Sequence, residues 1–330
     1  MSRFKVMVTD YEYKDLLIEE EILNQFNIEL IACQCHTEDD VIDACRNADA
    51  IINQYAPITK KVIQSLTNCK IIARYGIGVN TIDIDAATKS HIIISNVPDY
   101  CIDEVSNHAI SLLLSLARKI PFYNQKVKNQ KWDYKEGAPL FRLKNQTLGL
   151  VGFGRIPQLV AKKAKAFGLN ILAYDPYVDE TIAQERQVRL VDLNTLCRQS
   201  DFISLHAPLT NQTKDMIGEA EFSIMKKQSY LINTARGPLI NESALIQAIK
   251  EKKIAGAALD VLSSEPISPD HPFLQLENVI LTPHVAWYSE ESEIDLRKKV
   301  AQSIMDVLHG YYPNYIVNRE LYQKRFLKVK

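Results

Sequence analysis

The feature that most constrains this chain is a glycine-rich turn at residues 149–157 (GLVGFGRIP), set between an apolar run and an amphipathic segment. Residues 147–151 predict a buried strand, and a helix is predicted to begin at about Arg155. Gly152 and Gly154 would let the backbone turn tightly and approach a pyrophosphate, which the amide groups of the helix's first turn would bind. The turn therefore predicts a dinucleotide-binding domain.

An acidic residue follows the turn at the spacing that a ribose contact requires. Asp175 closes the apolar run 171–174 and follows Gly154 by about 20 residues, as in the dinucleotide fingerprint. A carboxylate there accepts bonds from a ribose 2′-hydroxyl and repels a 2′-phosphate, which favours NAD over NADP. Pro157 replaces the third glycine of the fingerprint; proline is tolerated in the first turn of a helix, so we expect a looser site. A glycine turn without a ligand is the alternative.

Length and charge limit the partners of the chain. Its 330 residues exceed the usual size of one core, so we expect two domains. The 39 basic and 40 acidic side chains nearly cancel, which argues against a nucleic acid or an anionic membrane as the main partner and favours a small ligand. The sequence has neither a signal-peptide pattern nor a membrane-spanning apolar run, and we expect a cytoplasmic protein.

The six cysteines are scattered through a core-rich chain, and we interpret them as reduced thiols. Residues 33–36 (CQCH) superficially suggest a metal site. Because no second pair of ligands follows at a suitable spacing, we predict a strand end with incidental thiols and no metal.

Two series of apolar runs alternate with helical patterns, which predicts an α/β fold with parallel sheets and right-handed crossovers. The second series has the pattern of a Rossmann domain. The residues from 124 to 145 are polar and weakly periodic, and predict a surface excursion or an arm that reaches another subunit. Strands are predicted at 5–9, 29–32, 50–53, 70–74, 92–95, 147–151, 171–174, 201–206, 229–234, 256–259 and 279–281, and helices at 44–48, 60–66, 104–119 (ending before Pro121) and 290–308, with no regulatory module expected after the last.

Three polar residues that follow strands of the second series have complementary chemistry: Arg236, Glu265 and His284. The carboxyl ends of parallel strands border the ligand crevice, so we expect the three side chains to converge beside a nicotinamide. Reduction of a 2-oxo acid needs a proton donor for the carbonyl oxygen, a cation that binds the substrate carboxylate, and a protein carboxylate that keeps the donor protonated. His284, Arg236 and Glu265 supply these three groups. Taken singly, each has an ordinary structural interpretation: a surface ion pair, a loop residue and a structural histidine.

The chain resembles the D-isomer-specific 2-hydroxyacid dehydrogenase family over essentially its whole length. Within that family it is most similar to the C-terminal binding protein branch, chiefly through residues 284–290 (HVAWYSE). The other segments that carry the resemblance are 74–83 (RYGIGVNTID), 96–98 (NVP), the glycine turn with 174–176 (YDP), 233–237 (NTARG), 259–261 (LDV) and 265–266 (EP).

This resemblance implies roles for further residues. Cofactor contacts are implied for Gly152, Gly154, Arg155 and Ile156 at the pyrophosphate, Asp175 at the ribose, Ala207, Pro208 and Thr213 on the adenine side, and Thr234, Ala235, Asp260 and Cys101 at the nicotinamide. Substrate contacts are implied for Tyr75, Gly76, Ile77, Gly78 and Arg236. Trp287 is either a packing residue or a pocket wall, and as a wall it would favour a flat or apolar substrate over a phosphate. Asn80 stands where relatives commonly have aspartate, and is interpreted as a turn residue.

The family architecture implies a flavodoxin-like substrate domain of residues 1–100 and 290–330, with a Rossmann NAD-binding domain of residues 101–289 inserted into it. Hinges are implied near Tyr100 and Trp287, and a homodimer is implied. The leading hypothesis is an NAD-dependent D-2-hydroxyacid dehydrogenase that reduces a 2-oxo acid with His284 as general acid. The alternative is an NADH-dependent binding or corepressor-like protein with secondary or vestigial catalysis. A formate dehydrogenase is disfavoured because a carboxylate, Glu265, accompanies the histidine.

Overall fold

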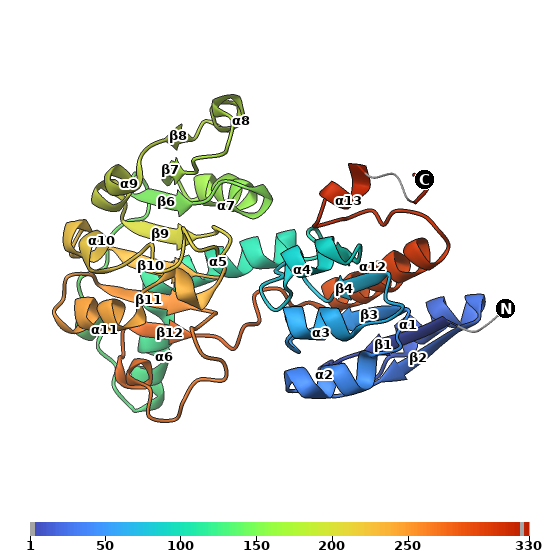
Figure 1. The fold of residues 1–330 in the computed structure, drawn as a ribbon. Coiled ribbons are helices and arrows are strands. Elements are labelled where there is room, and N and C mark those ends of the chain that lie inside the picture. Colours follow the sequence, from blue (N-terminus) through green and yellow to red (C-terminus); the bar gives the residue numbers. More distant parts are fainter. Residues whose placement is uncertain (1–3, 324–326, 330) are drawn as a thin grey trace. The chain divides into compact units, whose positions relative to one another are not determined.

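The computed structural model describes residues 4–323 and 327–329. The chain divides into two units, unit 1 (Met1–Cys101 with Ser289–Lys330) and unit 2 (Ile102–Tyr288), each built on one parallel sheet with flanking helices (Figure 1). The predicted α/β class is therefore confirmed. The predicted domain limits, 101 and 289, each lie one residue from the limits of unit 2. Residues 1–3, 324–326 and 330 of the predicted substrate domain lie outside the described residues.

Unit 1 contains a five-stranded sheet in the order β2-β1-β3-β4-β5. Its strands are β1 (Phe4–Val8), β2 (Ile28–Ala32), β3 (Ala50–Asn53), β4 (Ile71–Arg74) and β5 (Ile93–Ser95). Its helices are α1 (Leu17–Leu23), η1 (Asn24–Phe26), α2 (Glu38–Cys45), α3 (Lys60–Ser65), α4 (Ile84–Lys89), α12 (Glu290–Leu308) and α13 (Glu320–Gln323). All five predicted strands of this unit are confirmed to within one residue at each end.

Unit 2 contains a seven-stranded sheet in the order β12-β11-β10-β9-β6-β7-β8. Its strands are β6 (Thr147–Val151), β7 (Asn170–Tyr174), β8 (Arg189–Leu190), β9 (Phe202–Leu205), β10 (Tyr230–Asn233), β11 (Gly256–Leu259) and β12 (Val279–Leu281). Its helices are α5 (Ile102–Arg118), α6 (Ile120–Lys128), η2 (Tyr134–Gly137), α7 (Arg155–Ala166), α8 (Glu180–Glu185), α9 (Leu193–Gln199), α10 (Glu219–Ile224), η3 (Gly237–Leu239), α11 (Glu242–Lys250) and η4 (Pro272–Gln275).

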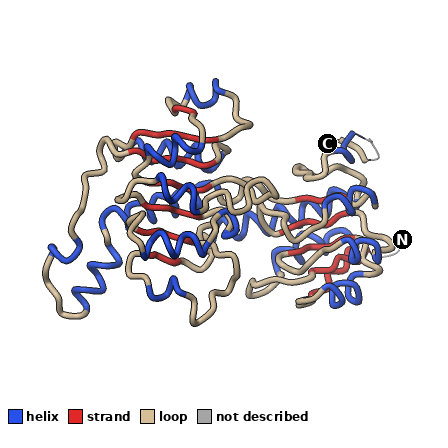
Figure 2. Tube along the Cα trace, turned by 60° about the vertical axis from the view of Figure 1, so that its left-hand side comes forward, coloured by secondary structure: helices blue, strands red, loops and turns tan. Residues whose placement is uncertain are grey.

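The central strands of unit 2 are apolar on both faces because helices cover both faces of the sheet (Figure 2). Every residue of β9 and β11 is buried. On one face Leu113 of α5 and Ala164 of α7 belong to one hydrophobic cluster, and on the other Leu196 of α9 and Leu245 of α11 belong to a second. This double cover explains why continuous apolar runs, rather than alternating ones, predicted these strands.

The order of the strands reverses between β6 and β9. The chain runs from β6 outward to β7 and β8, then returns to β9 on the other side of β6 and continues to β12. Such a switch point leaves a crevice at the carboxyl ends of the two central strands, because the connections leave in opposite directions. The glycine turn follows β6 directly, so the fold places it at this crevice.

The limits of two predicted helices are wrong. The helix predicted at 44–48 is α2, which begins earlier because Thr37 accepts a hydrogen bond from the Asp40 amide and forms a capping box with that residue. The helix predicted at 104–119 ends at Arg118, and Lys119 adopts φ +51°. Pro121 does not terminate helical structure there; it lies in the first turn of α6, where its missing N–H costs no hydrogen bond.

The segment 124–145, predicted as a surface excursion, carries part of α6 and all of η2. It is strongly exposed and aromatic: Trp132 is 89% exposed and Tyr134 is 77% exposed, and Phe141 is also exposed. The segment therefore lies on the surface, and its role as an arm to another subunit stays a prediction. Lys126 pairs with Glu136 at 3.4 Å, which fixes η2 against α6.

Across the described residues the structure contains no helix that is both long and apolar enough to cross a bilayer. All six cysteines, each of which is described, are free thiols, and Cys35, Cys45, Cys101 and Cys197 are buried. The predicted reduced state is therefore the state of the structure.

Candidate active site

The three residues predicted as catalytic follow three neighbouring strands. Arg236 follows β10, Glu265 follows β11 and His284 follows β12, and β10, β11 and β12 are adjacent in the sheet of unit 2. Because the strands are parallel, their carboxyl ends lie at one edge. The structure therefore brings together the three side chains that the sequence singled out.

The imidazole and the carboxylate form a direct pair. His284 Nδ1 lies 2.7 Å from Glu265 Oε2, and the other oxygen, Oε1, accepts a hydrogen bond from the Leu262 amide at 2.8 Å. Since an ionised carboxylate only accepts, Nδ1 carries the proton of this contact and Nε2 is left to face a substrate. The arrangement is that of an acid–base histidine oriented by a carboxylate.

Electrostatics keep this carboxylate ionised. Burial raises the pKa of Glu265, but the hydrogen bonds from His284 and from the Leu262 amide and the positive charges of His284 and Arg236 outweigh burial. The net effect holds the pKa of Glu265 below its usual value. The guanidinium of Arg236 is thus close enough to act on Glu265, although its hydrogen bond, from Nη1, goes to the Ala235 carbonyl at 2.6 Å.

A glycine permits the loops that carry Arg236 and Glu265 to touch. A Cβ atom built on Gly237 would lie 2.0 Å from the carbonyl carbon of Leu262, far inside van der Waals contact. Asn233, the last residue of β10, fixes the same loop. Its Nδ2 donates to the Arg236 carbonyl at 2.8 Å and its Oδ1 accepts from the Ala235 amide at 3.0 Å. The position of Arg236 therefore depends on two residues that have no reactive chemistry.

Asp260 braces the loop of His284. It is 2% exposed, and its Oδ1 and Oδ2 accept hydrogen bonds from the amides of Val285 at 3.0 Å and Ala286 at 2.9 Å. Its backbone carbonyl accepts from the His284 amide at 2.8 Å. His284 itself has φ +53°, a left-handed conformation that a residue with a side chain keeps only when its surroundings enforce it. The predicted contact of Asp260 with the nicotinamide stays a prediction.

The glycine turn has the geometry that phosphate binding requires. Gly152 has φ +92°, and a Cβ there would lie 2.9 Å from the His206 carbonyl carbon. A Cβ on Gly154, in contrast, would meet no atom within 4 Å, so open space lies beside the start of α7. Phe153, between the two glycines, is fully buried and anchors the turn in the core. α7 begins at Arg155, as predicted, and Pro157 lies buried in its first turn.

Asp175 is held at the end of β7 facing this turn. Its Oδ2 accepts a hydrogen bond from the Phe153 amide at 2.8 Å and its Oδ1 accepts from the Tyr177 amide at 2.9 Å. Each carboxylate oxygen has a further lone pair, so the two backbone contacts orient the group without using up its capacity to accept from a ribose.

The remaining predicted cofactor residues line the same strand ends. Ile156 packs partly into the core, and Ala207 is buried. Thr213 Oγ1 donates to the Pro208 carbonyl at 2.6 Å and closes the loop after β9. Thr234 is 8% exposed, and its Oγ1 is buried with no hydrogen-bond partner among the described residues. An orphaned hydroxyl at a strand end, together with the open space at Gly154, fits a dinucleotide that would occupy both places.

A second histidine near this edge is unsuited to proton transfer. His206 follows β9, and its Nε2 lies 2.9 Å from Ser204 Oγ. Burial lowers the pKa of His206 to about 3. Its imidazole is therefore neutral at neutral pH.

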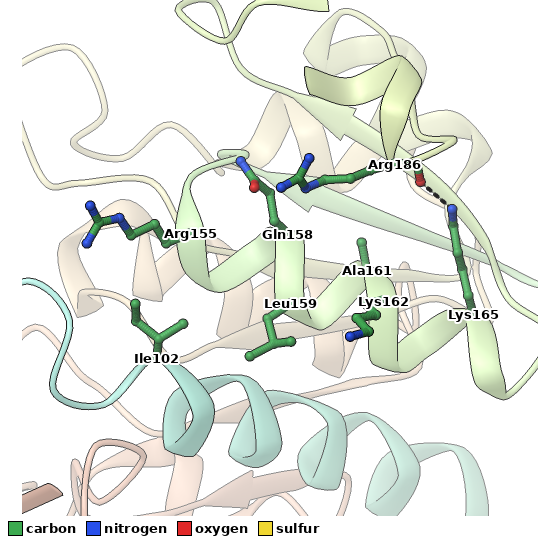
Figure 3. A pocket seen from close by; sticks show the side chains of 8 residues that line it. All are labelled: Ile102, Arg155, Gln158, Leu159, Ala161, Lys162, Lys165 and Arg186. Atoms are coloured by element: carbon green, nitrogen blue, oxygen red, sulfur yellow. Dashed lines mark hydrogen bonds between the residues drawn. The ribbon is translucent and has the colours of Figure 1, made fainter. Parts of the chain in front are cut away.

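A cavity of about 520 Å³ runs along the outer side of α7 (Figure 3). Its charged lining is entirely basic. Arg155 lies at the glycine turn, and Gln158 contacts the turn, since its Nε2 donates to the Phe153 carbonyl at 2.9 Å; Leu159, Ala161, Lys162 and Lys165 follow the helix toward its other end. The cavity therefore begins at the glycine turn and extends along α7. It is lined by Ile102, Arg155, Gln158, Leu159, Ala161, Lys162, Lys165 and Arg186.

The predicted substrate segment belongs to unit 1. Gly76 has φ +131° and leaves no room for a Cβ beside Arg74, and the Ile77 carbonyl accepts from Asn96 Nδ2 at 2.7 Å. The side chain of Tyr75 is 2% exposed and its hydroxyl donates to the buried Glu19 at 2.8 Å, so the phenol serves the core of unit 1. Substrate contacts by Gly76, Ile77 and Gly78, and a nicotinamide contact by the buried Cys101, stay predictions.

Sequence reasoning missed two residues that position Arg236. Gly237 and Asn233 act through backbone approach or hydrogen bonds, and neither belongs to a reactive type in a suggestive spacing. Gly237 had a signal in the sequence, because a glycine directly after a strand-end arginine indicates a close approach of two loops. Trp287 stacks edge-on against Tyr288 with ring centroids 5.5 Å apart, and its role as a pocket wall stays a prediction.

Comparison with known proteins identifies the family. Residues 110–286 match the model described as D-isomer specific 2-hydroxyacid dehydrogenase, NAD binding domain. The chain is 40% identical over 318 residues to a D-3-phosphoglycerate dehydrogenase of Methanocaldococcus jannaschii, covering 95% of this chain and 59% of that protein. It is 38% identical to a glyoxylate reductase of Korarchaeum cryptofilum, covering 86% and 87% of the two chains.

A solved structure agrees with these relatives. The D-lactate dehydrogenase of Aquifex aeolicus, complexed with NAD and lactic acid, superposes with a TM-score of 0.85 at 27% identity over 98% of both chains. The chain thus spans little more than half of the phosphoglycerate dehydrogenase but most of the glyoxylate reductase and nearly all of the lactate dehydrogenase. Residues 110–286 form an NAD-binding domain, and the chain belongs to the D-isomer-specific 2-hydroxyacid dehydrogenase family of oxidoreductases.

Proposed function

We propose that this protein is an NAD-dependent D-2-hydroxyacid dehydrogenase that works mainly as a reductase of small 2-oxo acids. The observation that carries the proposal is the contact between His284 Nδ1 and Glu265 Oε2, which lie 2.7 Å apart. Glu265 follows β11, which is adjacent to β10, the strand that Arg236 follows. A family that acts on 2-hydroxy acids needs this combination of proton donor, carboxylate and carboxylate-binding cation.

Each side chain has a defined task in this reaction. A bound NADH supplies the hydride that adds to C2 of the oxo acid. His284 holds a proton at Nε2 and donates it to the carbonyl oxygen, while Glu265 orients the ring through its contact with Nδ1. Arg236 binds the substrate carboxylate with two parallel N–H groups and polarises the carbonyl. In the oxidation direction, the neutral imidazole accepts the proton of the hydroxyl.

The proposal is tested by a screen of 2-oxo acids with NADH, followed at 340 nm. The panel holds glyoxylate, pyruvate, hydroxypyruvate, a branched acid and an aromatic acid, with 3-phosphoglycerate and NAD tested in the oxidation direction. We expect turnover of at least one unphosphorylated acid and preference for it over the phosphate ester, since Trp287 offers no positive charge to a phosphate. Cofactor binding without turnover of any acid would instead favour an NADH-dependent binding protein of the C-terminal binding protein type.

The preference for NAD over NADP rests on Asp175. Replacing it by asparagine keeps an acceptor for the Phe153 amide but removes the charge that repels a 2′-phosphate. We expect Asp175→Asn to lower the ratio of kcat/KM for NADH to that for NADPH by about tenfold, or about 1.4 kcal/mol. Glu180→Ala, which removes an exposed carboxylate at the start of α8, is the matched control and should leave the ratio unchanged. An unchanged ratio in Asp175→Asn would contradict the assignment.

We further propose that the protein forms a homodimer through the segment 124–145 and acts in the cytoplasm. The exposed side chains of Trp132, Tyr134 and Phe141 support an interface there. The six free thiols support a reducing compartment. Light scattering during gel filtration measures the mass, and a monomer at micromolar concentration would contradict the dimer.

A further inference from the structure

The histidine of α5, His108, contacts the residues that hold the His284 loop. His108 Nε2 lies 3.1 Å from Thr282 Oγ1 and 3.5 Å from Asp260 Oδ1. α5 precedes the glycine turn in the chain, whereas Thr282 and Asp260 lie at the far end of the sheet, after β12 and β11. The contact therefore ties the helix that covers the sheet to the loop that carries the proton donor.

The direction of each hydrogen bond in this chain follows from the number of protons. Thr282 Oγ1 is 2.6 Å from Asp260 Oδ1, and an ionised carboxylate can only accept, so the single hydroxyl proton of Thr282 is committed to Asp260. The Thr282 oxygen must then accept from His108. The proton of His108 is therefore on Nε2. His108 donates to Thr282, and Thr282 donates to Asp260.

Asp260 needs these donors because its carboxylate is buried. Its side chain is fully buried, and Oδ1 and Oδ2 also accept from the amides of Val285 and Ala286, the two residues after His284. A buried carboxylate keeps its orientation only while its hydrogen bonds are complete, since an unsatisfied lone pair in the interior is costly. The orientation of Asp260 in turn sets the loop in which His284 holds φ +53°.

We propose that His108 is a positioning residue: through Thr282 and Asp260 it fixes the loop that presents His284 to the substrate. It touches neither cofactor nor substrate in this scheme, and it acts by keeping Nε2 of His284 within reach of the carbonyl oxygen. Displacement of a general acid by a fraction of an ångström lowers the rate of proton transfer without changing ground-state binding. The inference rests on the proposed reductase activity.

Removing His108 is expected to lower kcat selectively. We expect His108→Ala to lower kcat about tenfold while KM for the oxo acid and Kd for NADH change less than threefold. His108→Gln, whose amide can donate to Thr282, should recover most of the loss. Thr282→Val interrupts the same chain, so the double variant His108→Ala/Thr282→Val should be no slower than Thr282→Val alone. If His108→Ala does not fold, Thr282→Ser and Thr282→Val provide the same comparison, because serine keeps the hydroxyl.

The control is the neighbouring residue on α5. Asn107 donates to Asp103 and accepts from Lys163, away from the His284 loop, and Asn107→Ala should leave kcat unchanged. A wild-type kcat in His108→Ala, a glutamine variant as slow as alanine, or additive losses in the double variant would each overturn the positioning role. Wild-type turnover is measured first: its absence refutes the proposed function and this inference with it, whereas turnover that His108→Ala leaves unchanged refutes the positioning role alone.

Discussion

Replacing His284 with alanine is expected to lower kcat for the reduction of a 2-oxo acid by about a thousandfold, which lies within the range that a single general acid contributes. His206, which follows β9, is not expected to replace it, because burial holds that imidazole neutral. Kd for NADH should stay within about twofold of the wild-type value, because the glycine turn and Asp175 lie at other strands of the sheet. Steady-state kinetics and fluorescence titration with NADH measure the two quantities.

The chain offers a matched control for this variant. His271 also lies beside a glutamate, with Nε2 3.6 Å from Glu242, but it caps η4 through the Phe273 amide. His271→Ala should therefore keep kcat within about twofold while losing a similar imidazole. A His284→Ala enzyme that turned over as fast as His271→Ala would exclude His284 as the proton donor.

Replacing Arg236 with alanine is expected to lower kcat/KM for the oxo acid about hundredfold or more, equivalent to about 3 kcal/mol. The loss should fall mainly on KM, because the substrate carboxylate loses its two-point partner, and Kd for NADH should change little. Arg198→Ala, at the exposed end of α9, is the control. Partial recovery by added guanidinium would support direct contact, and a KM equal to that of the wild type would exclude it.

The same variant has a signature in its pH dependence. The positive charge of Arg236 helps to hold the pKa of Glu265 below its usual value. Without that charge the pKa of Glu265 rises, so the carboxylate becomes protonated at a higher pH than in the wild type. The acid limb of the kcat/KM profile should therefore move to higher pH in Arg236→Ala.

Most of the elements and the grouping of Arg236, Glu265 and His284 at one sheet edge were predictable because they leave periodic or compositional signals. Buried parallel strands are continuous apolar runs, which located β6 and β11 to the residue. Strand-end polar residues identified Arg236, Glu265 and His284. α2 was misplaced because its start depends on a capping box at Thr37 rather than on apolar periodicity. β8 was missed because two residues at a sheet edge carry no pattern.

The support of the site could not be predicted in the same way. Asp260 was singled out for a cofactor contact, but its hydrogen bonds to the amides of Val285 and Ala286 depend on a loop conformation that no local pattern specifies. His108 precedes Thr282 by 174 residues in the sequence, and only the packing of α5 on β10 and β11 brings the two within 3.1 Å. Such contacts arise from tertiary structure, and a single sequence does not encode them as spacing.

The near-overlap at Gly237 limits how the sequence of this chain can vary. Because any side chain there would collide with the Leu262 carbonyl, the two loops would separate and move the guanidinium and the glutamate in one step. A residue without a side chain thereby becomes as intolerant of mutation as Arg236 and Glu265 themselves. Backbone clearance, and not chemistry alone, limits the sequences that this strand end can accept.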